Sequence, residues 1–251
     1  MRISSKSWGD FVTALAKIND KAAAEALRYY RDTYLVSRDR KALINYAFGL
    51  ATKYGEAASA LAATYYDAIS AASHAAVAAA EPAATATIAE VAEAVNGGLQ
   101  FSENENFISH TIARLVKQAG ADTMAKNARR DRAEYAWIPS GGETCPLCLA
   151  LAANGWQPAT QKTAGGDHAS HIHANCQCMF AVRFVRDTEV AGYDPQKYER
   201  KYASAEGDNS TQRINYLRRQ NYRQNKETIL AQQREAYAIR VAEREKSSET
   251  T

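Results

Sequence analysis

Residues 166–178 read GDHASHIHANCQC and hold three of the five histidines and two of the four cysteines in the chain. The other two cysteines lie upstream in GGETCPLCLALAANGW, residues 141–156, where only two residues separate them. Paired thiolates presented by one tight turn are strong zinc ligands. This window decides how the second half of the chain folds. A metal site, a catalytic centre and a disulfide are the three alternatives for it.

Composition and the lack of a secretory segment favour a metal site over a disulfide. The chain has 251 residues, a formal charge of +3, 46% hydrophobic and 24% charged residues, values that are ordinary for a soluble globular protein of one or two domains. So mild a charge does not by itself indicate nucleic-acid binding. The first twenty residues contain no apolar segment of the secretory kind, and the alanine-rich run at about 71–80 is too short to cross a membrane. We therefore expect a reducing compartment, where paired cysteines hold metal more often than they form disulfides.

Apolar residues recur every three or four positions along the first half, which is the spacing of amphipathic helices. One stripe runs from Phe11 to about Tyr34. A second starts at Leu43 and enters the alanine-rich run. Because alanine favours helix and proline ends it, we expect this helix to persist until Pro82. Such a helix would be roughly 55–60 Å long.

Two further helices complete an all-α first half. The third covers roughly residues 85–95 and is expected to stop at Asn96-Gly97-Gly98, because glycine tolerates a left-handed helix terminus. The fourth begins at a capping box formed by Ser102 and Glu105. Its apolar positions are Ile108, Ile112, Leu115 and Ala119.

From Tyr135 onward the pattern changes to that of a small mixed module. YAWIPSGGETCPLC predicts a short strand, a Pro/Gly turn and a cysteine knuckle, and LCLALAA predicts one or two helical turns. CMFAVRFV predicts a second strand with Phe180, Val182 and Phe184 on one face. The polar segment GYDPQKYERKYASAEGDNS then reads as loop with a short helix, and residues 211–246 read as a solvated helix or a pair of helices.

These patterns predict a mainly α fold. It comprises long alanine-rich helices in the N-terminal half, a small zinc-stapled α+β module at about 137–185, and a helical basic tail. Three parts follow along the chain: a helical domain at 1–130, a zinc-binding module at 131–190, and a loop with an extended helical tail at 191–251.

Five side chains are candidates for four tetrahedral zinc positions: Cys145, Cys148, His173, Cys176 and Cys178. At least one of the five is therefore expected not to bind the metal, and His173 is the borderline member, either a ligand or a hydrogen-bond partner of a sulfur. His168 and His171 are weaker candidates. A closed set of four ligands leaves no position for water, so a structural zinc is the favoured hypothesis over a catalytic one.

Two classes of metal-dependent enzyme are alternatives for this window. A zinc deaminase needs H-x-E followed by P-C-x-x-C, and no H-x-E occurs in the chain, which excludes that class. A metal-dependent nuclease would need a second histidine set, and only His168 and His171 keep that alternative open.

The same window resembles a known module. TCPLCLALAANGW, a spacer containing Gly, Asp and His, HIHANCQC and the following apolar strand resemble the C-terminal zinc-binding module of phage minor capsid proteins. These are head-morphogenesis proteins related to protein F of phage Mu, and the nearest likeness is to the branch from phages and prophages of Gram-positive bacteria. GYDPQKYERKY at 192–202 and the Gln/Arg-rich tail extend the resemblance, which covers roughly residues 137–241. Many relatives have Arg or Asp at the position of Gln177, which we expect to point away from the metal.

The resemblance implies a low-copy structural protein of the virion with no enzyme activity. Its implied cofactor is structural zinc, and its implied partners are portal and capsid proteins, with no membrane and no small-molecule substrate. Its implied location is the capsid interior or portal vertex, after assembly in the host cytoplasm. The resemblance carries the five candidate metal residues over onto this chain.

The tail supplies an alternative, a nucleic-acid-binding module that contacts packaged DNA. Arginine and lysine neutralise phosphates, and interleaved tyrosines stack on bases. The candidate partner- or DNA-binding residues are Arg213, Arg218, Arg219, Arg223 and Lys226, interleaved with Tyr216 and Tyr222. A solvated helix face with partial counter-charges is the competing interpretation.

Overall fold

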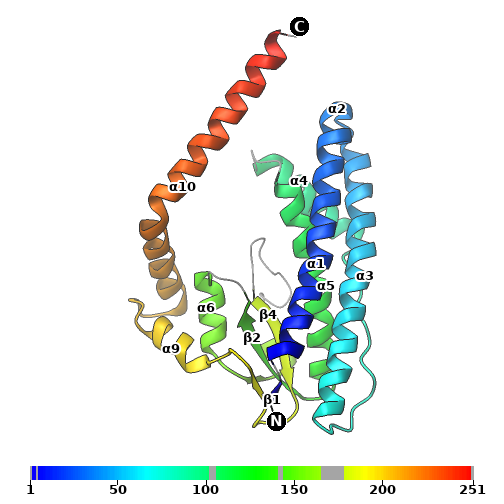
Figure 1. Ribbon diagram of the computed structural model, residues 1–251, viewed down its shortest axis with the longest axis vertical. Coiled ribbons are helices and arrows are strands. Elements are labelled where there is room, and N and C mark those ends of the chain that lie inside the picture. The colour runs from blue at the N-terminus through cyan, green and yellow to red at the C-terminus, as the bar shows by residue number, and fades with distance from the viewer. Residues whose placement is uncertain (1, 4, 102–105, 141–143, 165–177, 250–251) are drawn as a thin grey trace.

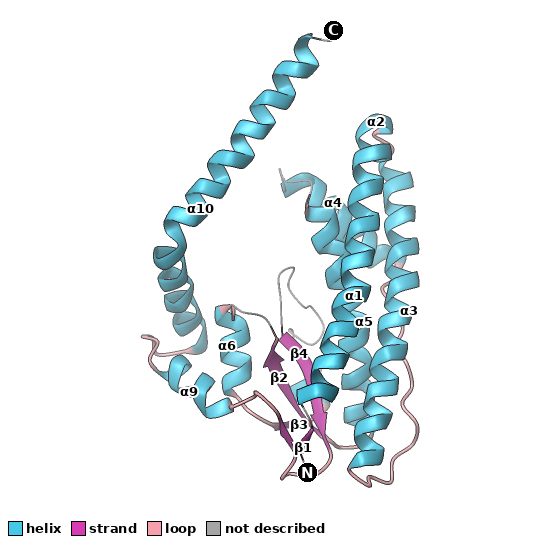
Figure 2. Ribbon diagram, in the orientation of Figure 1, coloured by secondary structure: helices cyan, strands magenta, loops and turns pink. Residues whose placement is uncertain are grey.

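The computed structural model describes residues 2–3, 5–101, 106–140, 144–164 and 178–249. The protein is mainly helical with a small sheet, as predicted (Figures 1 and 2). Its first half contains β1 (Arg2–Ile3), α1 (Ser5–Tyr29), η1 (Tyr30–Tyr34, π-helical), α2 (Leu35–Ser37), α3 (Arg40–Ala72), α4 (Ile88–Phe101) and α5 (Phe107–Arg130). Its second half contains β2 (Glu134–Pro139), α6 (Pro146–Ala153), β3 (Gln157–Pro158), α7 (Gln161–Ala164), β4 (Cys178–Arg183), β5 (Glu189–Val190), α9 (Pro195–Ala203) and α10 (Ser210–Glu249). Within the described ranges, no helix combines the length and the apolarity needed to cross a bilayer.

Helices α1, α3 and α5 pack side by side as a bundle (Figure 1). Small residues allow the close approach of α3 and α5: Ala58 and Ala62 are fully buried, and a Cβ at Gly120 would lie 3.5 Å from the Ala58 carbonyl oxygen. The hydroxyl of Ser59 donates to the Ala119 carbonyl at 3.1 Å across the same contact. Alanine in this chain therefore serves close packing of helices as well as helix propensity.

The prediction that the second helix persists to Pro82 is wrong, because α3 ends at Ala72. Residues 74–87, here called the strap, leave the helix and run across α3 and α5. Asp67 accepts from the Ala80 amide at 2.7 Å, and Thr123 accepts from the Ala83 amide at 3.0 Å. Asn127 accepts from the Glu81 amide at 3.0 Å and donates to its carbonyl at 2.9 Å. These side chains satisfy the backbone groups that a longer helix would have paired.

The predicted stop at Asn96-Gly97-Gly98 is also wrong, because α4 continues to Phe101. A Cβ at Gly98 would lie only 2.1 Å from the Phe107 ring, so this glycine permits close packing and does not end the helix. The predicted capping box of Ser102 and Glu105 lies outside the described residues.

The sheet confirms the two strands predicted after Tyr135. β2 lies between β3 and β4, and both pairings are antiparallel. Trp137 pairs with Phe180, and Pro139 pairs with Cys178. The ring of Phe180 stacks on Tyr135 at 4.8 Å between centroids and meets Trp137 edge-on at 5.2 Å. LCLALAA forms α6, as predicted.

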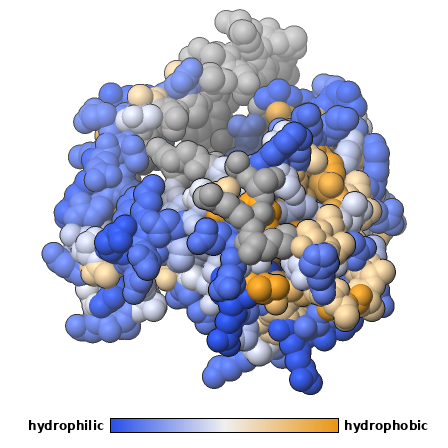
Figure 3. Space-filling view, turned by 60° about the horizontal axis from the view of Figure 1, so that its bottom comes forward, coloured by the Kyte–Doolittle hydropathy of each residue, from blue (hydrophilic) through white to orange (hydrophobic). Residues whose placement is uncertain are grey.

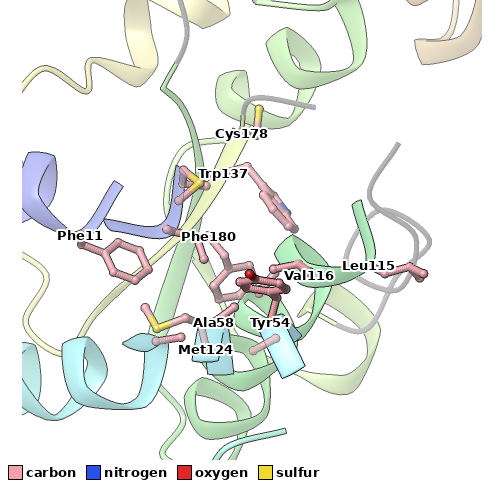
Figure 4. Close-up of a cluster of buried hydrophobic side chains, with 14 of the residues drawn as sticks. Phe11, Tyr54, Ala58, Leu115, Val116, Met124, Trp137, Cys178 and Phe180 are labelled. Carbon is pink, nitrogen blue, oxygen red and sulfur yellow. The ribbon is translucent and has the colours of Figure 1, made fainter. Parts of the chain in front are cut away.

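The first half is not purely helical, because β1 pairs in parallel with β5 from the far end of the chain. This short pairing ties the N-terminus to the region after β4. The buried core is likewise continuous from the bundle to the sheet, and Figure 4 shows Phe11 of α1, Met124 of α5 and Phe180 of β4 within one cluster.

Candidate metal centre

Cys145 and Cys148 form a knuckle at the start of α6. Cys145 occupies the N-cap with extended backbone (φ −62°, ψ 153°), and Pro146 follows in the first turn. The Cys145 Sγ accepts a hydrogen bond from the Cys148 backbone N–H at 3.2 Å. A sulfur held at a helix N-terminus by a backbone amide is stabilised as thiolate, the form that binds metal. The knuckle expected from the spacing therefore forms at the start of α6, and the metal-binding role of its two cysteines stays a prediction.

Cys178 is the first residue of β4 and is fully buried. Its pairing with Pro139 places it beside the end of β2, and Figure 1 shows the start of β4 at the same end of the module as the start of α6. In Figure 4 its sulfur lies at the edge of the aromatic cluster near Trp137. The topology thus carries a thiol from the second motif to the end of the module that holds the knuckle.

Two tyrosines that the sequence analysis did not single out lie close to Cys178. Tyr193 donates its hydroxyl to the Ala152 carbonyl at 2.8 Å and packs edge-on against Trp156. Burial raises the pKa of Tyr193, and the negative fields of Tyr198 and Cys178 raise it further. Burial raises the pKa of Tyr198 as well, again with a contribution from Cys178.

The GYDP motif positions both tyrosines. Asp194 is the N-cap of α9 and accepts from the amides of Gln196 and Lys197, while Pro195 occupies the first turn. α9 packs against α6. An Asp-Pro pair is a helix-start signal, and it could have located Tyr198 one turn into a helix from the sequence.

The remaining metal candidates, His173 and Cys176, lie outside the described residues, as do His168 and His171. The described part of the chain contains no group of three or more Cys, His, Asp or Glu residues arranged to hold a metal ion. Cys145, Cys148 and Cys178 are thiols and form no disulfide with one another. The structure therefore joins two of the five candidates in a knuckle and brings a third to the same end of the module.

The basic candidates of α10 divide into two groups. The Nε of Arg213 donates to the Gly207 carbonyl at 3.0 Å, and its guanidinium lies 5.8 Å from the Tyr202 ring centre, so this residue closes the turn before α10. The other four, Arg218, Arg219, Arg223 and Lys226, are exposed. Figure 3 shows the side of the molecule formed by α9 and the start of α10 as mostly hydrophilic, whereas hydrophobic surface gathers over the bundle.

Comparison with known proteins places the chain in a family. A family model described as VG15 protein matches residues 2–205, which include the bundle, the module and α9 and end before α10. No curated protein and no solved structure matches the chain. VG15 is a viral and phage protein family, and the match covers well over half of the sequence. The chain therefore belongs to the VG15 family of phage proteins.

Proposed function

We propose that this phage protein is a structural minor capsid protein that acts in head morphogenesis and associates with the portal and the inner capsid. The observation that carries the proposal is α10, a helix of 40 residues that extends away from the body (Figure 1). Its start packs on α6, while Tyr222 and Tyr237 are 48% and 65% exposed. Long helices in proteins gain most of their stability from tertiary packing, so α10 is suited to being covered by a partner.

In this proposal the module binds one structural zinc ion through Cys145, Cys148, Cys176 and Cys178, with His173 as a ligand or as a hydrogen-bond partner of a sulfur. The knuckle hydrogen bond and the burial of Cys148 and Cys178 support this assignment. Zinc would contribute folding free energy to a module whose elements are short. The chain is proposed to have no catalytic role and to reside in the virion.

A contact with packaged DNA is the second candidate, and one observation favours it. Residues 210–226 contain five cationic side chains and no acidic residue. Contacts with several phosphates would weaken steeply as salt rises, since each contact releases counterions. An interface anchored by Leu217 and Leu230 would be far less sensitive to salt.

The test is deletion of residues 211–251. We expect a folded, zinc-loaded protein that no longer enters heads when it replaces the full chain during assembly. Zinc content measured by elemental analysis and circular dichroism verify that the truncated protein is intact, so loss of incorporation reports on the tail alone.

A matched variant separates the two candidates. Arg218→Gln, Arg219→Gln and Arg223→Gln together keep helix-forming side chains but remove three charges. If α10 contacts portal or capsid protein through its apolar residues, this variant enters heads; if DNA is the partner, its DNA affinity and the salt dependence of that affinity both fall. Normal incorporation of the truncated chain would contradict the proposed role of α10.

A further inference from the structure

A groove of about 880 Å³ lies between α4 and α5, beside the end of the strap. Glu90, Glu93 and Gly97 line it from α4, and Arg114, Gln118 and Asp122 line it from α5. These positions are three or four residues apart on each helix, so each set forms one helix face. A Cβ at Gly97 would meet nothing within 4 Å, so the α4 wall is open at that point.

The groove is polar and carries net negative charge. Three carboxylates face one guanidinium in its lining. Glu93 is exposed, and the Glu90 carboxylate accepts from the Thr87 amide at 2.7 Å at the start of α4. Burial lowers the pKa of Arg114, while the charges of Glu90 and Glu93 oppose that shift. The lining also contains the Asn96 Oδ1, a buried acceptor that has no hydrogen-bond partner among the described residues. Such a lining favours a ligand that brings positive charge and hydrogen-bond donors.

The start of α10 has the complementary properties. Arg218, Arg219, Tyr222, Arg223 and Lys226 follow one another at helical spacing on one face, and all five are exposed; this set is called the basic stripe. Ile214 and Leu217 are less exposed, in the part of α10 that packs on α6. The basic stripe is therefore an exposed face of a regular helix.

We propose that the basic stripe of one copy docks in the α4–α5 groove of a second copy of this chain. Guanidinium groups form paired hydrogen bonds with carboxylates such as Glu93. Tyr222 supplies an aromatic ring beside Ala94, which also lines the groove. Helix-in-groove contacts of this kind are a recurrent mode of protein association.

The groove of the same chain is not the target. The start of α10 is held against α6, and Figure 1 shows α6 and α10 on one side of the small sheet with the bundle on the other. The start of α10 would have to detach from α6 before the basic stripe could reach α4 of the same chain. A second copy needs no such rearrangement. This inference concerns the isolated chain and stands apart from the proposed role in heads.

The experiment measures self-association of the full chain by light scattering and sedimentation over a range of concentrations. We expect a complex at about 50 mM salt that weakens at about 500 mM, since screening acts on exposed charges. Glu93→Lys and Arg219→Glu should each weaken the association by about tenfold or more, as expected for reversal of a charge at an electrostatic contact. The chain that carries both substitutions should recover most of the wild-type affinity, because the pair is then restored with its signs exchanged.

Mixing the two single variants identifies the partner. The Glu93→Lys chain keeps an intact stripe and the Arg219→Glu chain keeps an intact groove, so the mixture should associate more strongly than either variant alone. Glu199→Lys, an exposed charge reversal on α9, is the matched control and should leave the association unchanged. A chain that stays monomeric at about 50 mM salt overturns the proposal, as does a double variant no stronger than the weaker single one. If the Glu93→Lys and Arg219→Glu variants each associate as strongly as wild type, another surface mediates the association and the proposal is wrong.

Discussion

The bundle and the small module bury their side chains with elements of very different length. In the bundle, α3 alone spans 33 residues, and its neighbours close over Ala58, Ala62 and Tyr66 so that these side chains are fully buried. In the module, α6 has eight residues and β3 has two. Short elements bury little surface each, and small structural units commonly depend on a metal or disulfide. The knuckle cysteines therefore lie in a part of the chain that is built from short elements.

Cys145→Ser should have the largest effect, and it should be confined to the module. The substitution removes a proposed zinc ligand, and metal-coupled folding of small zinc modules is worth on the order of 10 kcal/mol. We expect zinc loss by elemental analysis and new proteolytic cuts between residues 134 and 183, while the bundle stays resistant. Ala150→Ser adds a hydroxyl to the same helix without removing a ligand and should behave as wild type. Cuts that fall mainly before Ala128 would show that the substitution loosens the bundle and not the module, which would contradict this prediction.

Asn127→Ala should have a smaller effect, centred on the bundle. Asn127 is fully buried and bonds both backbone groups of Glu81, so its loss removes the partners of a partly buried amide and carbonyl. We expect a loss of about 1–3 kcal/mol in the free energy of unfolding, measured with urea. Glu81→Gln is the matched control: it removes only the exposed ion pair with Lys126 and should cost less than about 1 kcal/mol. Equal effects of the two substitutions would mean that the strap is held by charge and not by Asn127.

Asp131→Asn should have the smallest effect and should depend on pH. Burial raises the pKa of Asp131, but the hydrogen bonds from Arg130 and Tyr66 outweigh it, and the pKa lies below its ordinary value of 3.8. A carboxyl whose pKa falls on folding stabilises the protein above the unfolded-state pKa, and this stabilisation disappears as pH falls through the folded-state pKa. We expect the variant to lose about 1 kcal/mol at neutral pH and to converge on wild type once the pH falls below the folded-state pKa of Asp131.

Hydrogen exchange of α5 in both proteins at both pH values measures this difference. Acid also affects the proposed zinc site, but that effect is common to the two proteins and cancels in the comparison. A difference that stays constant with pH would show that Asp131 acts through packing and not through its charge.

Local signals made much of the fold predictable. Apolar spacing located α1 and α5, and apolar, aromatic segments next to turn residues located β2 and β4. Each of these features depends on residues close together in the chain, where periodicity and turn chemistry operate. The ligand set with His173 and Cys176, and the division into parts at 130 and 190, remain predictions.

The features that the sequence did not reveal depend on distant partners. The end of α3 is determined by Thr123 and Asn127, which lie more than 50 residues beyond Ala72. α4 continues past Gly98, and this glycine packs against the Phe107 ring of the next helix. The proximity of Tyr193 to Cys178 arises from the packing of α9 on α6. A local pattern has no access to such contacts, so tertiary structure overrides propensity at these points.

The contacts of the strap also imply an order in which α3 and the strap fold during synthesis. When the ribosome has made residues 1–100, Thr123 and Asn127 do not yet exist, and the alanine-rich segment after Ala72 has only its own helical preference to follow. We therefore expect the nascent α3 to extend toward Pro82 and to give up its last turns when α5 emerges and offers its side chains to residues 80–83. On this expectation the strap reaches its final path late in translation, when hydrogen bonds to Thr123 and Asn127 replace those of the early helix.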